Sequence, residues 1–169
     1  MIDSHCHLDH EDLLSNLDQI VKRSKDSGLE KMLTICTTKK SFYSILNIIK
    51  FYPIIYGTYG IHPHEVKNDT FEKKEIINNV KKNDKIIGVG ESGLDYFYEN
   101  SEKKIQISSF INHIEASIEL NIPIIVHSRN AEDDTFNILN EYKNSNIKIL
   151  MHCFTGNLEL AKKLMKLNT

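Results

Sequence analysis

The first residues of the chain, MIDSHCHLD, hold His5 and His7 one residue apart, with Asp3 and Asp9 on either side. Residues i and i+2 of a strand point to the same side, so His5 and His7 can bind one metal ion together. Cys6 would point the other way, which predicts a packing role for its thiol. Imidazole and carboxylate groups together suit zinc, manganese, iron, nickel or magnesium, depending on the mixture.

Further histidines and one glutamate each follow a short apolar run. They are His62 and His64 in GIHPHEV, Glu91 in IIGVGESGLDYFY, His127 in IPIIVHSRN and His152 in IKILMHCFTG. A carboxylate such as Glu91 can bridge two ions. Two ions about 4 Å apart can share a water molecule, lower its pKa and stabilise an in-line displacement at phosphorus. The pattern therefore predicts one or two divalent ions in a hydrolytic site.

Other polar residues near these positions are candidates for contact with a substrate or for support of the ligands. His62 and His64 can approach the metal or the substrate, or cap a loop. Asp95 can orient a ligand histidine. Arg129, beside His127, can take a phosphate in a bidentate fork or be an ordinary surface arginine.

Two further features have both a functional and a packing interpretation. The aromatic run Tyr96-Phe97-Tyr98 can stack a base, although such a cluster also packs locally. His113 falls opposite the apolar stripe of its segment, so we expect it at the surface.

The segments that must position these residues alternate between short apolar runs and longer amphipathic stretches. The expected strands are Met1–Ser4, Lys31–Ile35, Ile54–Tyr59, Lys85–Gly90, Pro123–Val126 and Ile147–Met151. The amphipathic segments are Glu11–Ser27, Lys39–Phe51, Thr70–Lys82, Lys103–Leu120, Ala131–Tyr142 and Leu158–Leu167. Strands separated by helices imply a parallel α/β fold, in which ligands gather at the carboxyl ends of the strands.

Two α/β architectures fit this order, a doubly wound open sheet and a (β/α) barrel. The sequence contains neither GxGxxG nor GxxxxGK[ST], which weakens the nucleotide-binding version of the open sheet. No linker rich in proline and glycine divides the chain, so we expect one domain.

Composition excludes several classes of protein. The 169 residues carry a net charge of −2, so no basic surplus indicates nucleic-acid binding, and a phosphate ligand would need local charge or metal. The three cysteines form no CxxC pair, which favours reduced thiols. The first residues lack the pattern of a signal peptide, and no apolar run reaches membrane-spanning length. A cytoplasmic location without membrane contact is therefore expected.

The motifs DSHCHLD, GIHPHEV, GVGESGLDYFY, IPIIVHSR and HCFTG occur in an order that resembles the TatD family of metal-dependent deoxyribonucleases. The family belongs to the amidohydrolase-like TIM-barrel group. The resemblance implies that His5 and His7 hold one divalent ion, Mg, Mn or Zn, and that Glu91 bridges to a second. His127 and His152 would hold that second ion.

The resemblance also implies a TIM-barrel type of (β/α) fold, of which this chain supplies six of the eight βα units. Residues 1–169 would then form a single incomplete barrel domain that lacks the last two βα units. The family carries one more metal-binding aspartate after the eighth strand, and no equivalent is present in this sequence. A separate chain that completes the barrel is a possible partner.

We therefore expect a metal-dependent hydrolase that cleaves phosphodiester bonds, with DNA as substrate and 3′-end exonuclease character. Glu91 would be the catalytic residue, bridging the ions or positioning the water. The first alternative is a non-catalytic truncated remnant or one half of a split enzyme. The second is an amidohydrolase or phosphoesterase with a similar two-metal site, although Glu91 stands where such amidohydrolases often need a carboxylated lysine.

Overall fold

The computed structural model describes residues 1–98 and 100–167. Six parallel strands form one sheet, and each strand pairs with the next in the sequence. The strands are β1 (Ile2–Cys6), β2 (Lys31–Thr34), β3 (Ile55–Tyr59), β4 (Ile86–Asp95), β5 (Ile124–Arg129) and β6 (Ile149–Met151). The helices are α1 (Glu11–Leu14), α2 (Leu17–Asp26), α3 (Lys39–Phe51), α4 (Lys73–Val80), α5 (Lys103–Leu120), α6 (Glu132–Glu141) and α7 (Leu158–Leu164).

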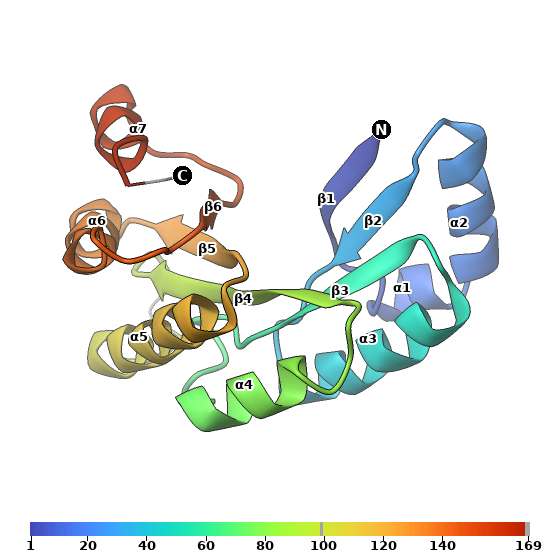
Figure 1. The fold of residues 1–169 in the computed structure, drawn as a ribbon, viewed down its shortest axis with the longest axis horizontal. Coiled ribbons are helices and arrows are strands. Elements are labelled where there is room, and N and C mark those ends of the chain that lie inside the picture. Colours follow the sequence, from blue (N-terminus) through green and yellow to red (C-terminus); the bar gives the residue numbers. More distant parts are fainter. Residues whose placement is uncertain (99, 168–169) are drawn as a thin grey trace.

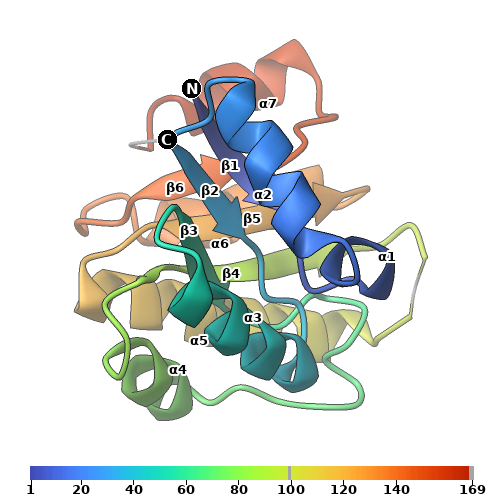
Figure 2. The same cartoon turned by 90° about the vertical axis from the view of Figure 1, so that its right-hand side faces the viewer.

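The sheet curls so that the helices lie on its outside (Figure 1). Figure 2 shows the same half-barrel after a quarter turn, with α2 and α3 nearest the viewer. A doubly wound sheet reverses its strand order at a switch point, whereas the order here runs from β1 to β6 without reversal. The TIM-barrel type of α/β fold with six βα units is therefore confirmed.

The alternation of strands and helices is confirmed, and two helices, α3 and α5, have the predicted bounds. Among the strands, the largest differences are at β4 and β5, which run on past the expected ends at Gly90 and Val126. The pairs Gly93↔His127 and Asp95↔Arg129 extend the ladder between these strands. Glycines and charged residues end the apolar pattern, but backbone pairing with a neighbouring strand does not depend on side-chain polarity.

The first amphipathic segment, expected to be one helix, is divided into α1 and α2 at Ser15 and Asn16. The Ser15 hydroxyl donates to the Asp12 carbonyl oxygen, and the Asn16 side-chain amide donates to the Ser15 hydroxyl. Such local side-chain bonds compete with the helical ladder, which explains the break. Gly28 follows α2 with a φ of 83°, the left-handed conformation of a residue that ends a helix.

Two groups of buried apolar side chains support the sheet. One lies between β1–β3 and α2–α4 and includes Ile45, Ile55 and Ile76. The other lies between β4–β6 and α5–α7 and includes Phe110, Val126 and Leu139. The three cysteines are free, and the Cys6 thiol packs toward β2, donating to the Leu33 carbonyl oxygen. In the part of the chain that the structure describes, no helix has both the length and the apolarity to cross a membrane.

The expectation that His113 lies at the surface is wrong, because its side chain is fully buried. Its Nε2 accepts a hydrogen bond from the Ile61 backbone N–H, and Nδ1 lies 2.7 Å from the Ser109 carbonyl oxygen. The ring also stacks against Phe71, which precedes α4. Helix α5 is therefore covered on two faces, by the sheet and by the segment before α4, and a single apolar stripe does not reveal the second contact.

Candidate metal centre

Five strands deliver histidine or glutamate to the same end of the sheet. His5 and Glu91 lie in β1 and β4, His127 lies in β5, His152 follows β6, and His62 follows β3. The structure groups these side chains as two triads, His5–Glu91–His152 and His62–Glu91–His127. Within each triad the potential ligand atoms lie within 4.8 Å of one another. Glu91 belongs to both triads, so its carboxylate lies between two pairs of imidazoles.

The Glu91 side chain is buried and contacts histidines on both sides. Its Oε1 lies 3.0 Å from His127 Nδ1 and 3.8 Å from His62 Nε2, and its Oε2 lies 3.4 Å from His5 Nε2. The contact with His5 lacks the geometry of a hydrogen bond. One carboxylate thus faces imidazoles from three strands of the sheet.

Local backbone features place Glu91 at this point. The register of β4 with β5 shifts between Val89 and Ser92, which leaves Glu91 outside the regular ladder. Its backbone N–H instead donates to the Cys36 carbonyl oxygen, beyond the end of β2. A Cβ at Gly60 would overlap the backbone of Gly90, so the segment that carries His62 touches β4 directly. A side chain at position 60 would separate His62 from Glu91.

Burial and charge set the protonation states of this cluster. Burial raises the pKa of Glu91, but the hydrogen bond with His127, the close contact with His5 and the electrostatic attraction of the neighbouring imidazoles outweigh it and hold the pKa well below its usual range. Burial lowers the pKa of His62 to about 3 and also lowers the pKa of His152. An ionised carboxylate beside neutral imidazoles is the state that binds metal.

His127 differs from the other histidines of the cluster. Burial lowers its pKa, but hydrogen bonds to the carboxylates of Glu91 and Asp95 outweigh this effect, and the net pKa is raised. A proton is therefore held at this imidazole more firmly than at His62. A cation bound between Glu91 and His127 would have to displace the proton from Nδ1.

Asp95 orients two imidazoles and a loop. Its Oδ2 lies 2.8 Å from His64 Nε2 and 3.0 Å from His127 Nε2, while Oδ1 accepts the backbone N–H groups of Phe97 and Tyr98. Burial raises the pKa of Asp95, but these hydrogen bonds have the larger effect, and the net pKa is lowered. The carboxylate is therefore ionised and only accepts hydrogen bonds. Both imidazoles then carry hydrogen on Nε2, which leaves Nδ1 of His127 facing Glu91.

Several buried polar atoms of the cluster have no hydrogen-bond partner among the described residues. They are Nδ1 and Nε2 of His5, Nδ1 of His7 and Oδ1 of Asp9. The His5 ring stacks on His152, with ring centroids 3.4 Å apart. Buried polar groups are normally paired, and unpaired lone pairs of nitrogen and oxygen are the groups that a divalent cation satisfies. The donor set therefore fits a bound divalent ion.

The side chains that the structure brings together differ in part from the set expected from the sequence. His5, Glu91, His127 and His152 meet in the triads, whereas His7 lies beside His5 but outside both. His62, expected as a candidate to approach the metal or the substrate or to cap a loop, lies in the second triad. Its signal in the sequence is the HPH motif, which repeats the spacing of His5 and His7 after another strand.

His64 and Asp9 also lie near the Glu91 cluster but outside both triads. His64 faces Asp95 instead of Glu91. Asp9, which sequence reasoning did not single out as a site residue, has a buried carboxylate oxygen beside this cluster. The signal for Asp9 is its place two residues after His7.

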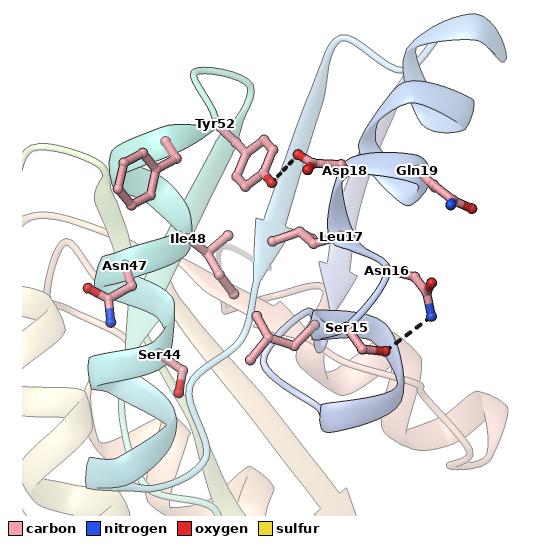
Figure 3. A pocket seen from close by; sticks show the side chains of 11 residues that line it. Ser15, Asn16, Leu17, Asp18, Gln19, Ser44, Asn47, Ile48 and Tyr52 are labelled. Carbon is pink, nitrogen blue, oxygen red and sulfur yellow. Dashed lines mark hydrogen bonds between the residues drawn. The ribbon is translucent and has the colours of Figure 1, made fainter.

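Two hollows on the surface differ in their chemistry. A cavity of about 560 Å³ is lined by His127 and His152 of the triads and extends to Arg129 and Phe97. Another, of about 460 Å³, lies between α2 and α3, where the hydroxyl of Tyr52 donates to the carboxylate of Asp18 (Figure 3). No histidine is among the described residues that line the second hollow, so the first is the cavity continuous with the candidate metal centre.

Comparison with known proteins gives consistent matches. The family model described as TatD related DNase matches residues 2–169. An uncharacterized metal-dependent hydrolase, BU355, of Buchnera aphidicola is 40% identical over 99% of this chain and 67% of its own length. A protein of Erwinia billingiae named 3′-5′ ssDNA/RNA exonuclease TatD is 28% identical over 94% of this chain and 61% of its own length.

The structural comparison agrees with the fold. The crystal structure of YJJV, a TatD homologue from Escherichia coli, matches with a TM-score of 0.89 and 23% identity, covering 99% of this chain and 65% of that protein. The chain spans about two thirds of the length of these relatives.

Proposed function

Because the chain belongs to the TatD family of metal-dependent hydrolases, we propose that its Glu91 cluster binds one or two divalent ions, with Mg, Mn or Zn as candidates, and hydrolyses phosphodiester bonds of DNA. The observation that carries this proposal is the position of one buried carboxylate between two pairs of histidines. Such an arrangement suits two cations that share a ligand.

The residues that would hold the ions are His5, Glu91 and His152 on one side, and His62 and His127 on the other. His7 and Asp9 contribute further buried donor atoms next to His5. A divalent ion bound here supplies Lewis acidity, which polarises the phosphoryl group and makes a water molecule more acidic.

The protein side chains supply orientation and charge. Glu91 keeps a negative charge among the imidazoles, because its pKa is held low, and this charge attracts cations into a buried place. Asp95 fixes the ring of His127 through Nε2 and so points Nδ1 at Glu91. Carboxylates that fix a ligand histidine in this way are worth about 10- to 100-fold in metal affinity or activity.

The finer activity that we propose is removal of nucleotides from the 3′ end of DNA. The name of the Erwinia billingiae relative, an exonuclease of single-stranded DNA and RNA, supports this direction and the choice of nucleic acid as substrate. An amidohydrolase with a similar two-metal site is less well supported, because β4 supplies a carboxylate, Glu91, to the cluster where such enzymes often need a carboxylated lysine.

The first and last strands of the sheet are edge strands, which is relevant to whether the domain is complete. Among the described residues, β1 pairs only with β2, and β6 pairs only with β5. We propose that residues 1–169 form one domain and that two more βα units complete its barrel, in the same chain or from a separate one. Unpaired edges accept further strands, which supports this proposal.

The test is hydrolysis of a 5′-labelled single-stranded oligodeoxynucleotide by the purified chain in Mn²⁺, in Mg²⁺ and in EDTA, with products resolved on a gel. We expect a ladder that shortens from the 3′ end with metal and no products in EDTA. Glu91→Gln should reduce the rate about 1,000-fold, the scale expected when a central charged group of such a site is removed. Glu102→Gln, the same change at an exposed position, should stay within about twofold of the parent.

Other outcomes would redirect the proposal. Cleavage of an amide panel but not of DNA would favour the amidohydrolase. An intact, metal-binding chain that cleaves neither substrate would favour a non-catalytic or incomplete domain, and addition of a chain that supplies the missing βα units would then be tested for restored activity.

A further inference from the structure

The cavity next to the candidate metal centre is lined by the metal-binding candidates at one end and by a cationic and an aromatic side chain at the other. Its lining runs from His127 and His152 to Phe97, Arg129 and Thr155. The histidines belong to the triads, so the same cavity joins the candidate metal centre to the other three residues. The cavity volume of about 560 Å³ is larger than a single phosphate needs.

The guanidinium of Arg129 lies on two aromatic rings. Its Cζ is 3.9 Å from the ring centroid of Phe97 and 4.7 Å from that of Tyr98. Among the described residues it forms no salt bridge, and no side-chain hydrogen bond holds it. Stacking fixes the plane of a guanidinium without using its N–H groups, so its donors remain free for a ligand.

The aromatic support is itself fixed in place. The backbone N–H groups of Phe97 and Tyr98 donate to Asp95 Oδ1, and the side-chain amide of Gln106 donates to the Asp95 carbonyl oxygen. The register of β4 with β5 pairs Asp95 with Arg129. The aromatic pair is thus held by the same carboxylate that orients His127, and Arg129 stacks on that pair.

The spacing along β5 relates Arg129 to the metal centre. Arg129 is two residues after His127, so both side chains lie on the same side of the strand, about 6.6 Å apart along it. Both also line the cavity. This separation is comparable to that between successive phosphates of an extended nucleic-acid strand.

We propose that Arg129, held on Phe97 and Tyr98, binds the phosphate that neighbours the one to be cleaved. This inference rests on the proposed function and narrows its substrate to a polynucleotide, because a small diester has no neighbouring phosphate. A guanidinium suits this role better than an ammonium group, since its planar fork can donate two parallel hydrogen bonds to one phosphate. Phe97 and Tyr98 are positioning residues that act through Arg129.

Lys103 provides a matched control. Its Nζ lies 4.1 Å from the ring centroid of Tyr96, so it also stacks a cation on an aromatic ring of the same segment. Lys103 lines a different hollow, with Glu102 and Gln106, and does not line the cavity that contains Arg129. Removing either cation changes the net charge by the same amount.

The experiment measures binding of a short fluorescent oligothymidylate by anisotropy, in EDTA to prevent hydrolysis and over a series of salt concentrations. We expect Arg129→Gln to weaken binding about 10- to 100-fold, as for loss of hydrogen bonds to a charged group. The slope of log K against log salt should fall by about 0.7, the value of one phosphate contact on a single strand. Arg129→Lys should keep the slope and lose part of the affinity, and Lys103→Gln should change neither.

The outcomes separate this inference from the proposed function. Equal effects of Arg129→Gln and Lys103→Gln, no effect of Arg129→Gln, or no binding by the parent chain would each overturn the phosphate site. Hydrolysis of bis(p-nitrophenyl) phosphate in Mn²⁺ is measured in parallel. If Arg129 controls oligothymidylate binding but no diester is cleaved, the proposed function fails and the phosphate site stands. If the small diester is cleaved and the oligothymidylate does not bind, the phosphate site fails and the proposed function stands.

Discussion

The chain buries histidines in two kinds of surroundings. His113 lies in the core behind β3, and both of its ring nitrogens have backbone partners, at Ile61 and Ser109. His5 lies at the carboxyl end of β1, and neither of its buried ring nitrogens has a hydrogen-bond partner among the described residues. Both nitrogens of the His113 ring have hydrogen-bond partners, whereas the neutral His5 ring has an unused lone pair on one nitrogen and an unused N–H on the other.

Hydrogen-bond partners, and not burial, separate a structural histidine from a candidate ligand in this chain. Burial alone does not separate them, because burial is most complete at His113. Unsatisfied nitrogens and a shared carboxylate do, since buried polar groups that lack partners are costly unless another group pairs with them. We therefore expect the two surroundings to respond to metal, acid and substitution in opposite ways.

The largest expected effect is stabilisation by metal. At a free Mn²⁺ concentration 1,000 times its dissociation constant, the free energy of unfolding should rise by about 4 kcal/mol, which is a rise of about 10 °C in Tm for a chain of this size. Glu91→Gln should abolish the shift, because it removes the charge shared by both triads. His113→Gln should keep the shift. Thermal melts with EDTA and with Mn²⁺ measure both, and an equal loss in the two variants would contradict the comparison.

Low pH should destabilise the folded chain through protonation of the buried His113. Burial lowers its pKa to about 4, below the value of about 6.5 in the unfolded chain. The unfolded state therefore binds more protons between these values, so the stability present above pH 6.5 falls as the pH falls toward 4, by about 3 kcal/mol at pH 4.

Urea unfolding of the parent and of His113→Gln, both in EDTA, checks this expectation. The other histidines titrate in both proteins, so the difference between the two pH profiles isolates His113. Parallel profiles from pH 7.5 to pH 4 would show that His113 is not held neutral by burial.

Loss of the satisfied imidazole should destabilise the fold. His113→Phe keeps a ring of similar size but leaves the Ile61 N–H without its acceptor and the Ser109 carbonyl without its partner. An unpaired buried group of this kind costs about 1–3 kcal/mol. Chemical denaturation in EDTA measures the change, and a variant as stable as the parent would contradict the structural role.

The smallest effect is expected for the same substitution at the other site. His5→Phe removes two buried nitrogens that have no hydrogen-bond partner and keeps a ring that can stack on His152. In EDTA the stability should stay within about 1 kcal/mol of the parent or rise, because replacing an unpaired polar group by an apolar one is close to neutral. The Mn²⁺ shift should nevertheless be lost. A large destabilisation in EDTA would show that His5 is a structural residue like His113.

Much of this molecule follows from local patterns in the sequence. The order of six strands and intervening helices, the bounds of α3 and α5, and the membership of a metal-dependent family all rest on residues that are near one another in the chain or on motifs. Histidine and glutamate at the ends of apolar runs indicated the functional end of the sheet, because parallel strands present their carboxyl ends together.

Which of these side chains meet depends on contacts between elements that are distant in the sequence. His62 faces Glu91 because Gly60 touches Gly90, two positions thirty residues apart whose contact depends on how closely β3 and β4 approach. Arg129 lies on Phe97 because β4 and β5 remain paired beyond their apolar runs. His113 is buried because α5 has two covered faces. Sequence periodicity reports one face of one element, whereas these contacts depend on the curvature of the whole sheet and on the packing of neighbouring elements.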